Sequence, residues 1–466
     1  MSVVARFERW ALGGIVAFFG AAYALYGLFR HWQFGSSAFD LGIFDQAVWH
    51  LSRFEAPAST ISGFTNILGD HFYPIIALFA PLYWLRAGPE MLIAAQAALF
   101  AASIVPVFLF IRSRLPGGPA LGFAIAYGCF WGIQRAAAFD VHETAFSPLV
   151  IATAILAVDR QKWILFWVLA GVMLLIKEDH ILLVGAFGIY LLIRGEPRRG
   201  VIAMATSVAA AFVVVGVIIP GASDTGATAY ISPYMDVLAR PWVLPIALVT
   251  PPVKIETAIL WFAPFAFFSL ASPLAILALP FALTRFLSDS SNHWGTVFHY
   301  SAPLAPIVAM SAADGLARIA GHLNAKGARR LTTGAALASV LLSAVLPGRQ
   351  PLWRVFAPGH YAASDSASVG RALLREIPAD ASIVAQAAIV PHLSMRDQIY
   401  MLDARAPDAD YVVASDSLNP WPATRFDELR ALLQARQARG YTVTTQKGGW
   451  TVLRRASGAS VGVDGQ

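Results

Sequence analysis

The sequence predicts an α-helical polytopic membrane protein that carries a small C-terminal α/β domain. Of its 466 residues, 57% are hydrophobic and only 13% are charged, whereas a soluble domain has about 25% charged residues. The mean hydropathy is +0.60, and long apolar runs alternate with short basic clusters, as membrane spans alternate with cytoplasmic loops. The composition changes after about Pro347. We therefore predict a membrane domain over residues 1–347, an extracytoplasmic α/β domain over residues 348–455 and a disordered tail over residues 456–466.

The charge pattern and the single cysteine exclude other classes. The formal net charge is +6, but the cations are spread over short loops, so no nucleic-acid partner is predicted. Cys129 is the only cysteine, which excludes an intrachain disulfide and leaves the redox compartment open.

The first apolar run, residues 10–29, is predicted to be an uncleaved signal anchor. It follows Arg6 and Arg9, and it is long enough for a hydrocarbon core that needs about 20 residues. With the N-terminus in the cytoplasm, about eleven spans place the later basic clusters inside, as the positive-inside rule requires. Several runs are short, so tilted, broken or buried helices are expected. The predicted spans are residues 10–29, 90–111, 119–136, 145–158, 163–177, 180–194, 201–220, 253–269, 271–287, 300–319 and 331–347.

The same topology places several polar clusters on the external side, together with the C-terminus. They lie at residues 39–46 (FDLGIFDQ), 69–74 (GDHFYP), 139–143 (FDVHE) and 177–180 (KEDH). Ionisable groups at the helix ends of a membrane protein lower its stability and usually mark a functional site. We therefore predict that these clusters converge on one cavity that opens to the external leaflet.

Asp40 and Asp45 are the candidate catalytic residues. Asp40 precedes a predicted short helix, residues 41–52, and the alternative reading is that it is only the N-cap of that helix. Asp45 lies one turn further on, between the apolar Phe44 and Val48. Such surroundings raise the pKa of a carboxyl group unless a cation or a metal ion compensates.

The other candidates are cations, histidines and carboxylates in the later clusters. An anionic lipid phosphate would explain why the cation Lys177 is held in this turn. For His71, the alternative reading is that it only caps the segment that follows it. Four side chains are candidates for a divalent metal ion or for the acceptor: His142, Glu143, Glu178 and Asp179. Their spacing matches no compact ligand motif, so the cofactor stays unknown, with a divalent metal ion as one possibility.

The C-terminal domain has its own periodicity. It predicts helices over residues 367–377 and 426–440 and strands over residues 382–386 and 411–415. A hairpin is predicted from residues 441–446 and 450–453 around two glycines. No G-x-G-x-x-G loop follows the first strand, so no dinucleotide site is predicted.

The motifs FDLGIFDQAVW, LGDHFYPIIALFAPLYWL, FDVHE, KEDH and HYSAPLAP resemble those of a bacterial membrane family that is still described as a domain of unknown function. That family is placed in the GT-C superfamily of polytopic glycosyltransferases and is similar to lipid A aminoarabinose and protein mannosyl transferases. The resemblance covers about residues 10–320. It implies an enzyme of the bacterial inner (plasma) membrane that takes a sugar from a polyprenyl phosphate on the external side.

The resemblance also implies roles for individual residues. Asp40 matches an acidic residue that acts as the catalytic base or positions the acceptor, and Lys177 matches a lysine that lies near the lipid phosphate. Residues 80–84 (APLYW) resemble a proline-rich segment. Leu41 stands where the superfamily has a second acidic residue, and His71 stands in place of a basic one.

This chemistry needs a carboxylate to take the proton of the acceptor hydroxyl and cations to stabilise the leaving phosphate. The candidates for phosphate binding are His71, Lys177, Arg285 and His299. The predicted partners are a polyprenyl-phosphate sugar donor and the bilayer, with the acceptor unknown. The alternative is a transporter or flippase of a lipid-linked or small polar substrate, which should show repeat symmetry and charges at the bilayer midplane. A non-catalytic subunit would leave the polar clusters unexplained.

Overall fold

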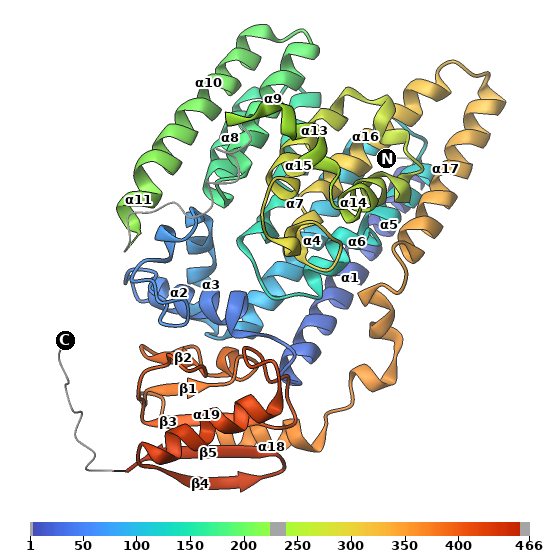
Figure 1. Cartoon of the computed structure of the whole chain (residues 1–466). Helices are drawn as coiled ribbons and strands as arrows, with labels where there is room; N and C mark the ends of the chain where they lie inside the picture. Colours follow the sequence, from blue (N-terminus) through green and yellow to red (C-terminus); the bar gives the residue numbers. More distant parts are fainter. Residues whose placement is uncertain (1–2, 224–238, 457–466) are drawn as a thin grey trace. The chain divides into compact units, whose positions relative to one another are not determined.

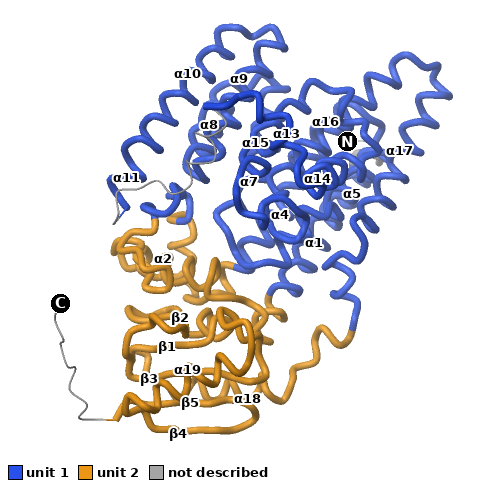
Figure 2. The backbone as a smooth tube through the Cα atoms, viewed as in Figure 1, with its two compact units in different colours: residues 1–27, 68–76, 93–357 blue, residues 28–67, 77–92, 358–466 orange. Residues whose placement is uncertain are grey.

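The computed structural model describes residues 3–223 and 239–456, which form two compact units (Figures 1 and 2). Unit 1 contains residues 1–27, 68–76 and 93–357, and unit 2 contains residues 28–67, 77–92 and 358–466. The described part of unit 1 is helical, and the sheet belongs to unit 2. Apart from Ala456, the predicted disordered tail lies outside the described residues.

The helices of unit 1 follow the apolar runs of the sequence. α1 (Val3–Trp32) and α4 (Pro89–Arg112) contribute residues to both units. The others are α5 (Gly117–Gly128), α6 (Trp131–Ala137), α7 (Ser147–Asp159), α8 (Trp163–Ile176), α9 (His180–Ile193), α10 (Pro197–Val213), α11 (Ile219–Ala222), α13 (Leu244–Val249), α14 (Val253–Phe262), α15 (Leu279–Phe286), α16 (Leu304–Ala320) and α17 (Ala325–Val345).

Only some of these helices are long enough to cross a bilayer alone. Among the described residues, three stretches qualify by length and composition: Arg6–Trp32, Pro89–Arg112 and Pro197–Ala222. The pair Pro241–Val249 and Val253–Phe265, which is bent by 73°, makes a fourth if it is one span. Shorter apolar helices such as α8 rise about 1.5 Å per residue and fall short of a core of about 30 Å. The total of about eleven spans therefore stays a prediction.

The predicted span over residues 119–136 consists of two helices. α5 ends at Gly128, Phe130 is extended (φ −61°, ψ 129°), and α6 begins at Trp131. The ring of Phe19 occupies the space that a Cβ atom on Gly128 would need. The close approach of these two segments therefore requires a glycine at the end of α5.

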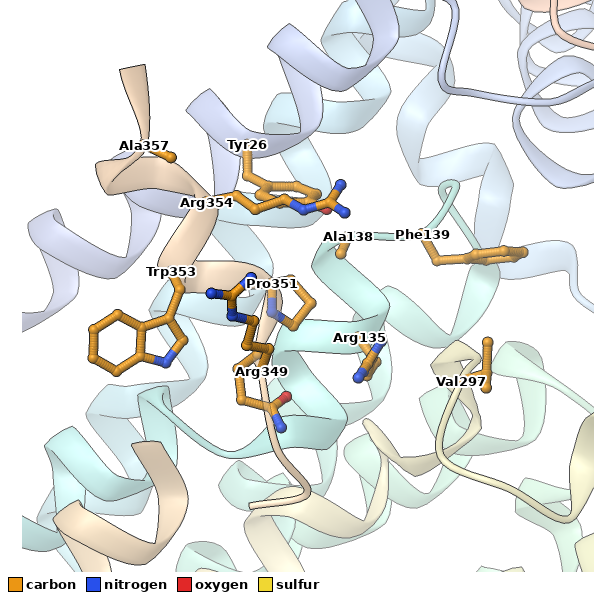
Figure 3. Close-up of a pocket in the computed structure, with 11 residues that line it drawn as sticks. Tyr26, Arg135, Ala138, Phe139, Val297, Arg349, Pro351, Trp353, Arg354 and Ala357 are labelled. Carbon is orange, nitrogen blue, oxygen red and sulfur yellow. The ribbon is translucent and has the colours of Figure 1, made fainter. Parts of the chain in front are cut away.

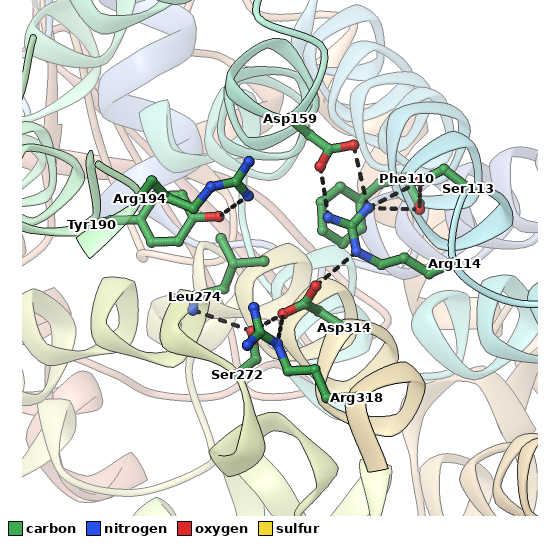
Figure 4. A network of polar contacts seen from close by, with 10 residues as sticks. All are labelled: Phe110, Ser113, Arg114, Asp159, Tyr190, Arg194, Ser272, Leu274, Asp314 and Arg318. Atoms are coloured by element: carbon green, nitrogen blue, oxygen red, sulfur yellow. Dashed lines mark hydrogen bonds and ion pairs between the residues drawn. The ribbon is translucent and has the colours of Figure 1, made fainter. Parts of the chain in front are cut away.

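A network of ion pairs joins the turn after α4 to α7 and α16 (Figure 4). Arg114 contacts Asp159 at 2.6 Å and Asp314 at 2.9 Å. Asp314 also binds Arg318 at 2.9 Å and accepts a hydrogen bond of 2.7 Å from Ser272. The two carboxylates neutralise the two arginines, which is how a partly buried cation is kept stable.

Unit 2 contains a five-stranded mixed sheet in the order β2-β1-β3-β5-β4. β1 is parallel to β2 and β3, and the pairs β3–β5 and β4–β5 are antiparallel. The strands are β1 (Ile383–Ala385), β2 (Ile399–Met401), β3 (Tyr411–Ser415), β4 (Tyr441–Lys447) and β5 (Trp450–Arg455). The predicted strands and the hairpin are confirmed. Gly448 and Gly449 have φ angles of 57° and 84°, as a two-residue hairpin turn with two positive φ angles requires.

Strand β1 is buried on both faces of the sheet, and its successive residues pack on opposite sides. Ile383 and Ala385 pack in the apolar cluster that includes α18 (Asp365–Leu374), whereas Val384 packs in the cluster that includes Leu429 of α19 (Phe426–Ala438). Figure 1 shows these two helices beside the sheet. The two predicted helices are thus present and end slightly earlier than expected.

The early segments of unit 2 add to the same core. They include α2 (Ile43–Ser52) and α3 (Ala80–Leu85). Phe34, Ala38 and Ile61 belong to the apolar cluster under the sheet, and the backbone N–H of Ala38 donates to the carbonyl of Ala387 at 2.8 Å. Unit 2 is therefore built from segments far apart in the sequence.

Candidate functional site

The polar residues of unit 1 are centred on the connection between α8 and α9. α8 ends at Ile176 and α9 begins at His180, so Lys177, Glu178 and Asp179 form the whole connection. Both helices are apolar along their length, which leaves the charges of this region on the connection itself. Lys177 is extended (φ −166°, ψ 154°) and ends the helix.

Lys177 forms an ion pair with Glu143. The Nζ atom donates to Oε1 at 3.0 Å, and the Glu143 side chain is 2% exposed. Burial alone would lower the pKa of Lys177, but Glu143 and the other nearby carboxylates outweigh it and hold the pKa well above its ordinary value. Lys177 is therefore a fixed cation. An ammonium group has three N–H donors, and its side chain is 19% exposed, so it can also reach a ligand.

His71 pairs with Glu178 in the same region. His71 Nδ1 lies 2.6 Å from Glu178 Oε1, and the backbone N–H of Phe72 donates to Oε2 at 3.1 Å. Burial acts to raise the pKa of Glu178, but the imidazolium of His71 and the ammonium of Lys177 lower it to about 2. Burial lowers the pKa of His71, and the Glu178 carboxylate more than reverses this. The predicted clusters GDHFYP and KEDH are thus joined by the ion pair of His71 with Glu178.

Asp179 begins a chain of hydrogen bonds that runs into the interior of unit 1. Its Oδ1 atom lies 2.5 Å from His180 Nδ1, and His180 Nε2 lies 2.8 Å from Ser147 Oγ. A nucleophilic triad has the same order of groups, but His180 and Ser147 are 0% exposed, so no substrate reaches the hydroxyl. This chain instead links the start of α7 to the α8–α9 connection, and no spacing in the sequence predicts it.

His142 and His299 stack on each other. Their ring centroids are 3.4 Å apart, and Phe139 stacks on both rings at 5.5 and 5.8 Å. Burial is the main cause that lowers the pKa of His299 well below its ordinary value, and electrostatic interactions with His142 and Lys177 lower it further. Its Nδ1 atom is buried without a hydrogen-bond partner. A neutral His299 can donate or accept a hydrogen bond, but it supplies no charge to a phosphate.

Arg285 is occupied by its own neighbours. Its three nitrogens donate to the carbonyls of His293 and Gly295 at 2.8 Å each and to Ser301 Oγ at 2.6 Å. In this structure the guanidinium holds the loop before α16 in place. Burial, together with the charges of Lys177 and Arg285, lowers the pKa of His293 to about 4. Phosphate binding by Arg285 stays a prediction.

Asp40 belongs to unit 2, and its predicted role as an N-cap is wrong. α2 begins at Ile43 with Gly42 as the N-cap. Asp40 lies in a π-helical turn, Ala38–Gly42, where its φ is 74° and its ψ is −85°. A positive φ is strained for a residue other than glycine, and such strain is concentrated at functional sites. Asp40 is therefore not explained as the N-cap of α2.

Asp45 also belongs to unit 2 and is completely buried. Its two oxygens accept hydrogen bonds from the hydroxyls of Tyr83 and of Ser394, the latter at 2.7 Å. Burial raises its pKa to about 7, although these hydrogen bonds act in the opposite direction. The predicted raised pKa follows from burial without a cation. The carboxylate connects three segments of unit 2, and a catalytic role for it stays a prediction.

The candidate site residues therefore fall into two groups. His71, His142, Glu143, Lys177, Glu178, Asp179, Arg285 and His299 lie in unit 1, and Asp40 and Asp45 lie in unit 2. Convergence of the two aspartates with the unit 1 residues stays a prediction. Within residues 3–223 and 239–456, no group of three or more His, Cys, Asp or Glu side chains is placed to bind a metal ion. Since Glu143 and Glu178 are engaged by cations, these donors do not fit a divalent metal ion.

Comparison with known proteins agrees with the fold. The chain is similar to the crystal structure of ArnT from Cupriavidus metallidurans bound to undecaprenyl phosphate, with a TM-score of 0.56 and 14% identity over 96% of this chain and 99% of ArnT. The apo structure of the same protein gives a TM-score of 0.53 with the same identity and coverage. No curated protein sequence matches this chain. The sequence matches the family described as "Predicted membrane protein (DUF2079)" over residues 30–452. The chain therefore belongs to the DUF2079 family of predicted membrane proteins.

Proposed function

We propose that this protein is a membrane glycosyltransferase that moves a sugar from a polyprenyl phosphate to an acceptor hydroxyl on the external side of the membrane. The observation that carries this proposal is the fold, which is shared along nearly the whole chain with ArnT, a protein crystallised with undecaprenyl phosphate. The donor class proposed here is thus the lipid class that the structural relative binds.

Lys177 supports this proposal as the group that holds the donor phosphate. It is a fixed cation at the end of an apolar helix, and Glu143 uses one of its three donors. His71 provides a second positive charge beside it, paired with Glu178. Charge-assisted hydrogen bonds from such groups become stronger as negative charge develops on the leaving phosphate.

Asp40 is the proposed base. It takes the proton of the acceptor hydroxyl while the acceptor oxygen forms a bond to the anomeric carbon of the sugar. The bond between that carbon and the phosphate oxygen breaks, and its electron pair leaves on the polyprenyl phosphate. The strained backbone of Asp40 supports this choice over Asp45, whose oxygens are engaged by two hydroxyls.

The test is transfer by the purified protein from a panel of polyprenyl-phosphate sugars, with the product measured by mass spectrometry. Asp40→Asn keeps the shape but removes the basicity, so turnover should fall by about 100-fold or more while donor binding persists. Asp380→Asn, on an exposed residue of unit 2, is the matched control and should leave turnover unchanged. Undiminished transfer by Asp40→Asn would remove it from this role and favour Asp45.

Donor binding is tested separately at Lys177. Lys177→Ala alone would leave the Glu143 carboxylate buried without its partner, which destabilises a protein. The double variant Lys177→Ala/Glu143→Gln avoids that buried charge and should weaken donor binding by about tenfold or more. Vesicle assays that show movement of a lipid-linked substrate, with no transfer from any donor, would favour the transporter instead.

A further inference from the structure

A cavity of about 710 Å³ lies in unit 1 between α1, α6 and the segment that follows α17 (Figure 3). Its charged lining consists of three arginines, Arg135, Arg349 and Arg354, and its walls include Tyr26 and Trp353. No Asp or Glu side chain is among the described residues that line it. The cavity is therefore positive and partly aromatic.

Two buried polar atoms at this cavity have no hydrogen-bond partner. One is Nε of Arg135, which is a donor, and the other is Oε1 of Gln350, which is an acceptor. The Gln350 residue is 2% exposed, and its Nε2 atom donates to the carbonyl of Gly348 at 3.1 Å. A buried donor or acceptor that stays unsatisfied is costly. Both atoms would be satisfied by a ligand that offers an oxygen and a hydroxyl.

The arginines of this cavity differ from Arg114 and Arg285, two of the less exposed arginines of unit 1. Arg114 is neutralised by two carboxylates (Figure 4), and Arg285 gives its hydrogen bonds to two carbonyls and a hydroxyl. In the part of the chain that the structure describes, no ion pair or hydrogen bond is assigned to the guanidinium of Arg135, Arg349 or Arg354. Three unpaired cations around one space favour an anionic ligand.

The backbone segment that carries Arg354 is held in place by contacts with α6 and α1. Arg354 lies in a 3-10 helix, Pro351–Phe356, and the backbone N–H of Leu352 in that helix donates to Oε1 of Gln134 in α6 at 3.0 Å. Phe356 at its end stacks on Phe18 of α1 with 6.5 Å between ring centroids. The segment that carries Arg354 is thus fixed to the helix that carries Arg135. The cavity is therefore bounded by segments of unit 1 that are hydrogen-bonded and packed against each other.

An apolar stripe leads up to the cavity along α17. Leu337, Leu341 and Val345 are all exposed and are spaced four residues apart, so they lie on one face of the helix. In a membrane protein such a face contacts lipid chains. Trp353, which lines the cavity, is also exposed. A ligand with a hydrocarbon chain could therefore place the chain on this stripe and its head group at the arginines.

We propose that this cavity binds the phosphate group of an anionic amphiphile, at a site separate from Lys177. Guanidinium groups match phosphate because each can donate two parallel hydrogen bonds to it. Phe139 lines the cavity and stacks on His142 and His299, so the bound head group lies one aromatic ring away from the histidines of the candidate site. The proposal does not depend on the transfer reaction.

The test is a binding titration of farnesyl phosphate in the background Lys177→Ala/Glu143→Gln, which removes the contribution of the other cation. Adding Arg135→Gln and Arg354→Gln should weaken the affinity by about tenfold to a hundredfold. Arg160→Gln makes the same charge change at an exposed residue at the end of α7 and should leave the affinity unchanged. Farnesol, which lacks the phosphate, should bind at least about tenfold more weakly than farnesyl phosphate.

Inorganic phosphate as a competitor identifies the source of the ligand. Displacement only at a much higher phosphate concentration assigns the site to a lipid head group, and displacement at an equal concentration assigns it to free phosphate. Unchanged affinity in the arginine variants, or equal binding of farnesol, overturns the proposal. If Arg135→Gln fails to fold, Arg349→Gln with Arg354→Gln, both on exposed side chains, carries the same test. Loss of sugar transfer has no bearing on these outcomes.

Discussion

Lys177 is partly buried and Asp45 is completely buried, and the two ionisable residues meet the cost of burial in different ways. Lys177 has an opposite charge beside it, Glu143, so it stays ionised. Among the residues that the structure describes, the side chain of Asp45 has the hydroxyls of Tyr83 and Ser394 as its hydrogen-bond partners. A hydroxyl can serve a neutral carboxyl group as well as an ionised one. Burial therefore favours the neutral form, and the pKa is raised to about 7.

The raised pKa of Asp45 predicts that stability depends on pH. The folded-state pKa of about 7 exceeds the ordinary value of 3.8, so the stabilisation is fully present below about pH 4 and is lost as the pH rises through 7. The full effect is at most about 4 kcal/mol. Thermal unfolding of the purified protein should show a midpoint that falls between pH 5 and pH 8. Asp45→Asn should reduce that fall, whereas Asp380→Asn should keep it; an equal fall in all three proteins would assign it to other groups.

Helix α18 approaches strand β5 so closely that a glycine is needed at the crossing. A Cβ atom on Gly370 would collide with the ring of Trp450. That ring is completely buried, and its Nε1 atom donates to the carbonyl of Ser366 at 2.8 Å. This hydrogen bond ties the indole to Ser366 of α18, so the ring cannot move aside without losing it.

Gly370→Ala should therefore destabilise unit 2 by about 1–3 kcal/mol, although alanine has the better helix propensity by about 1 kcal/mol. The measurement is chemical denaturation followed by tryptophan fluorescence. Ser368→Ala, at an exposed position of the same helix, is the control and should be close to neutral. A stabilised Gly370→Ala protein would mean that helix propensity outweighs the packing.

The elements differ in how far the sequence could predict them. Helical periodicity and turn glycines are local signals, and they predicted α18, α19 and the hairpin. β2 is only three residues long and is recognisable only by its pairing with β1. The π-helical turn before α2 moves the helix start beyond Asp40, and no local propensity indicates it.

The candidate site shows the same division between local and distant information. The sequence predicted that the clusters of Lys177 and Glu143 lie on the external side, but it did not predict the ion pair between these two residues. The stacking of His142 on His299 depends on packing between distant segments, so the spacing of residues could not reveal it. One signal for the arginine cavity was available: Arg135, Arg349 and Arg354 fall at the external ends of the predicted spans, where the positive-inside rule disfavours cations.

The topology of the whole molecule is a prediction that labelling can test. The N-terminus and the loop after residue 320 are expected inside, and the sheet of unit 2 is expected outside. In a Cys129→Ser background, an impermeant thiol reagent should label Gln446→Cys in intact cells and Lys326→Cys only after lysis; both positions are exposed in the structure. The reverse pattern would overturn the orientation and place the candidate site on the cytoplasmic side.

The assembly of unit 2 from distant segments has a consequence during synthesis. Asp45 and Ser394 are 349 residues apart, and ribosomes add about 5–20 residues per second. The first loop therefore emerges about 20–70 s before the chain that completes its core exists. During that interval the Asp45 carboxyl group remains hydrated, and the backbone N–H of Ala38 lacks its acceptor, the carbonyl of Ala387. A nascent chain arrested before Ser394 would thus display this loop to proteases and chaperones, whereas the finished protein would conceal it.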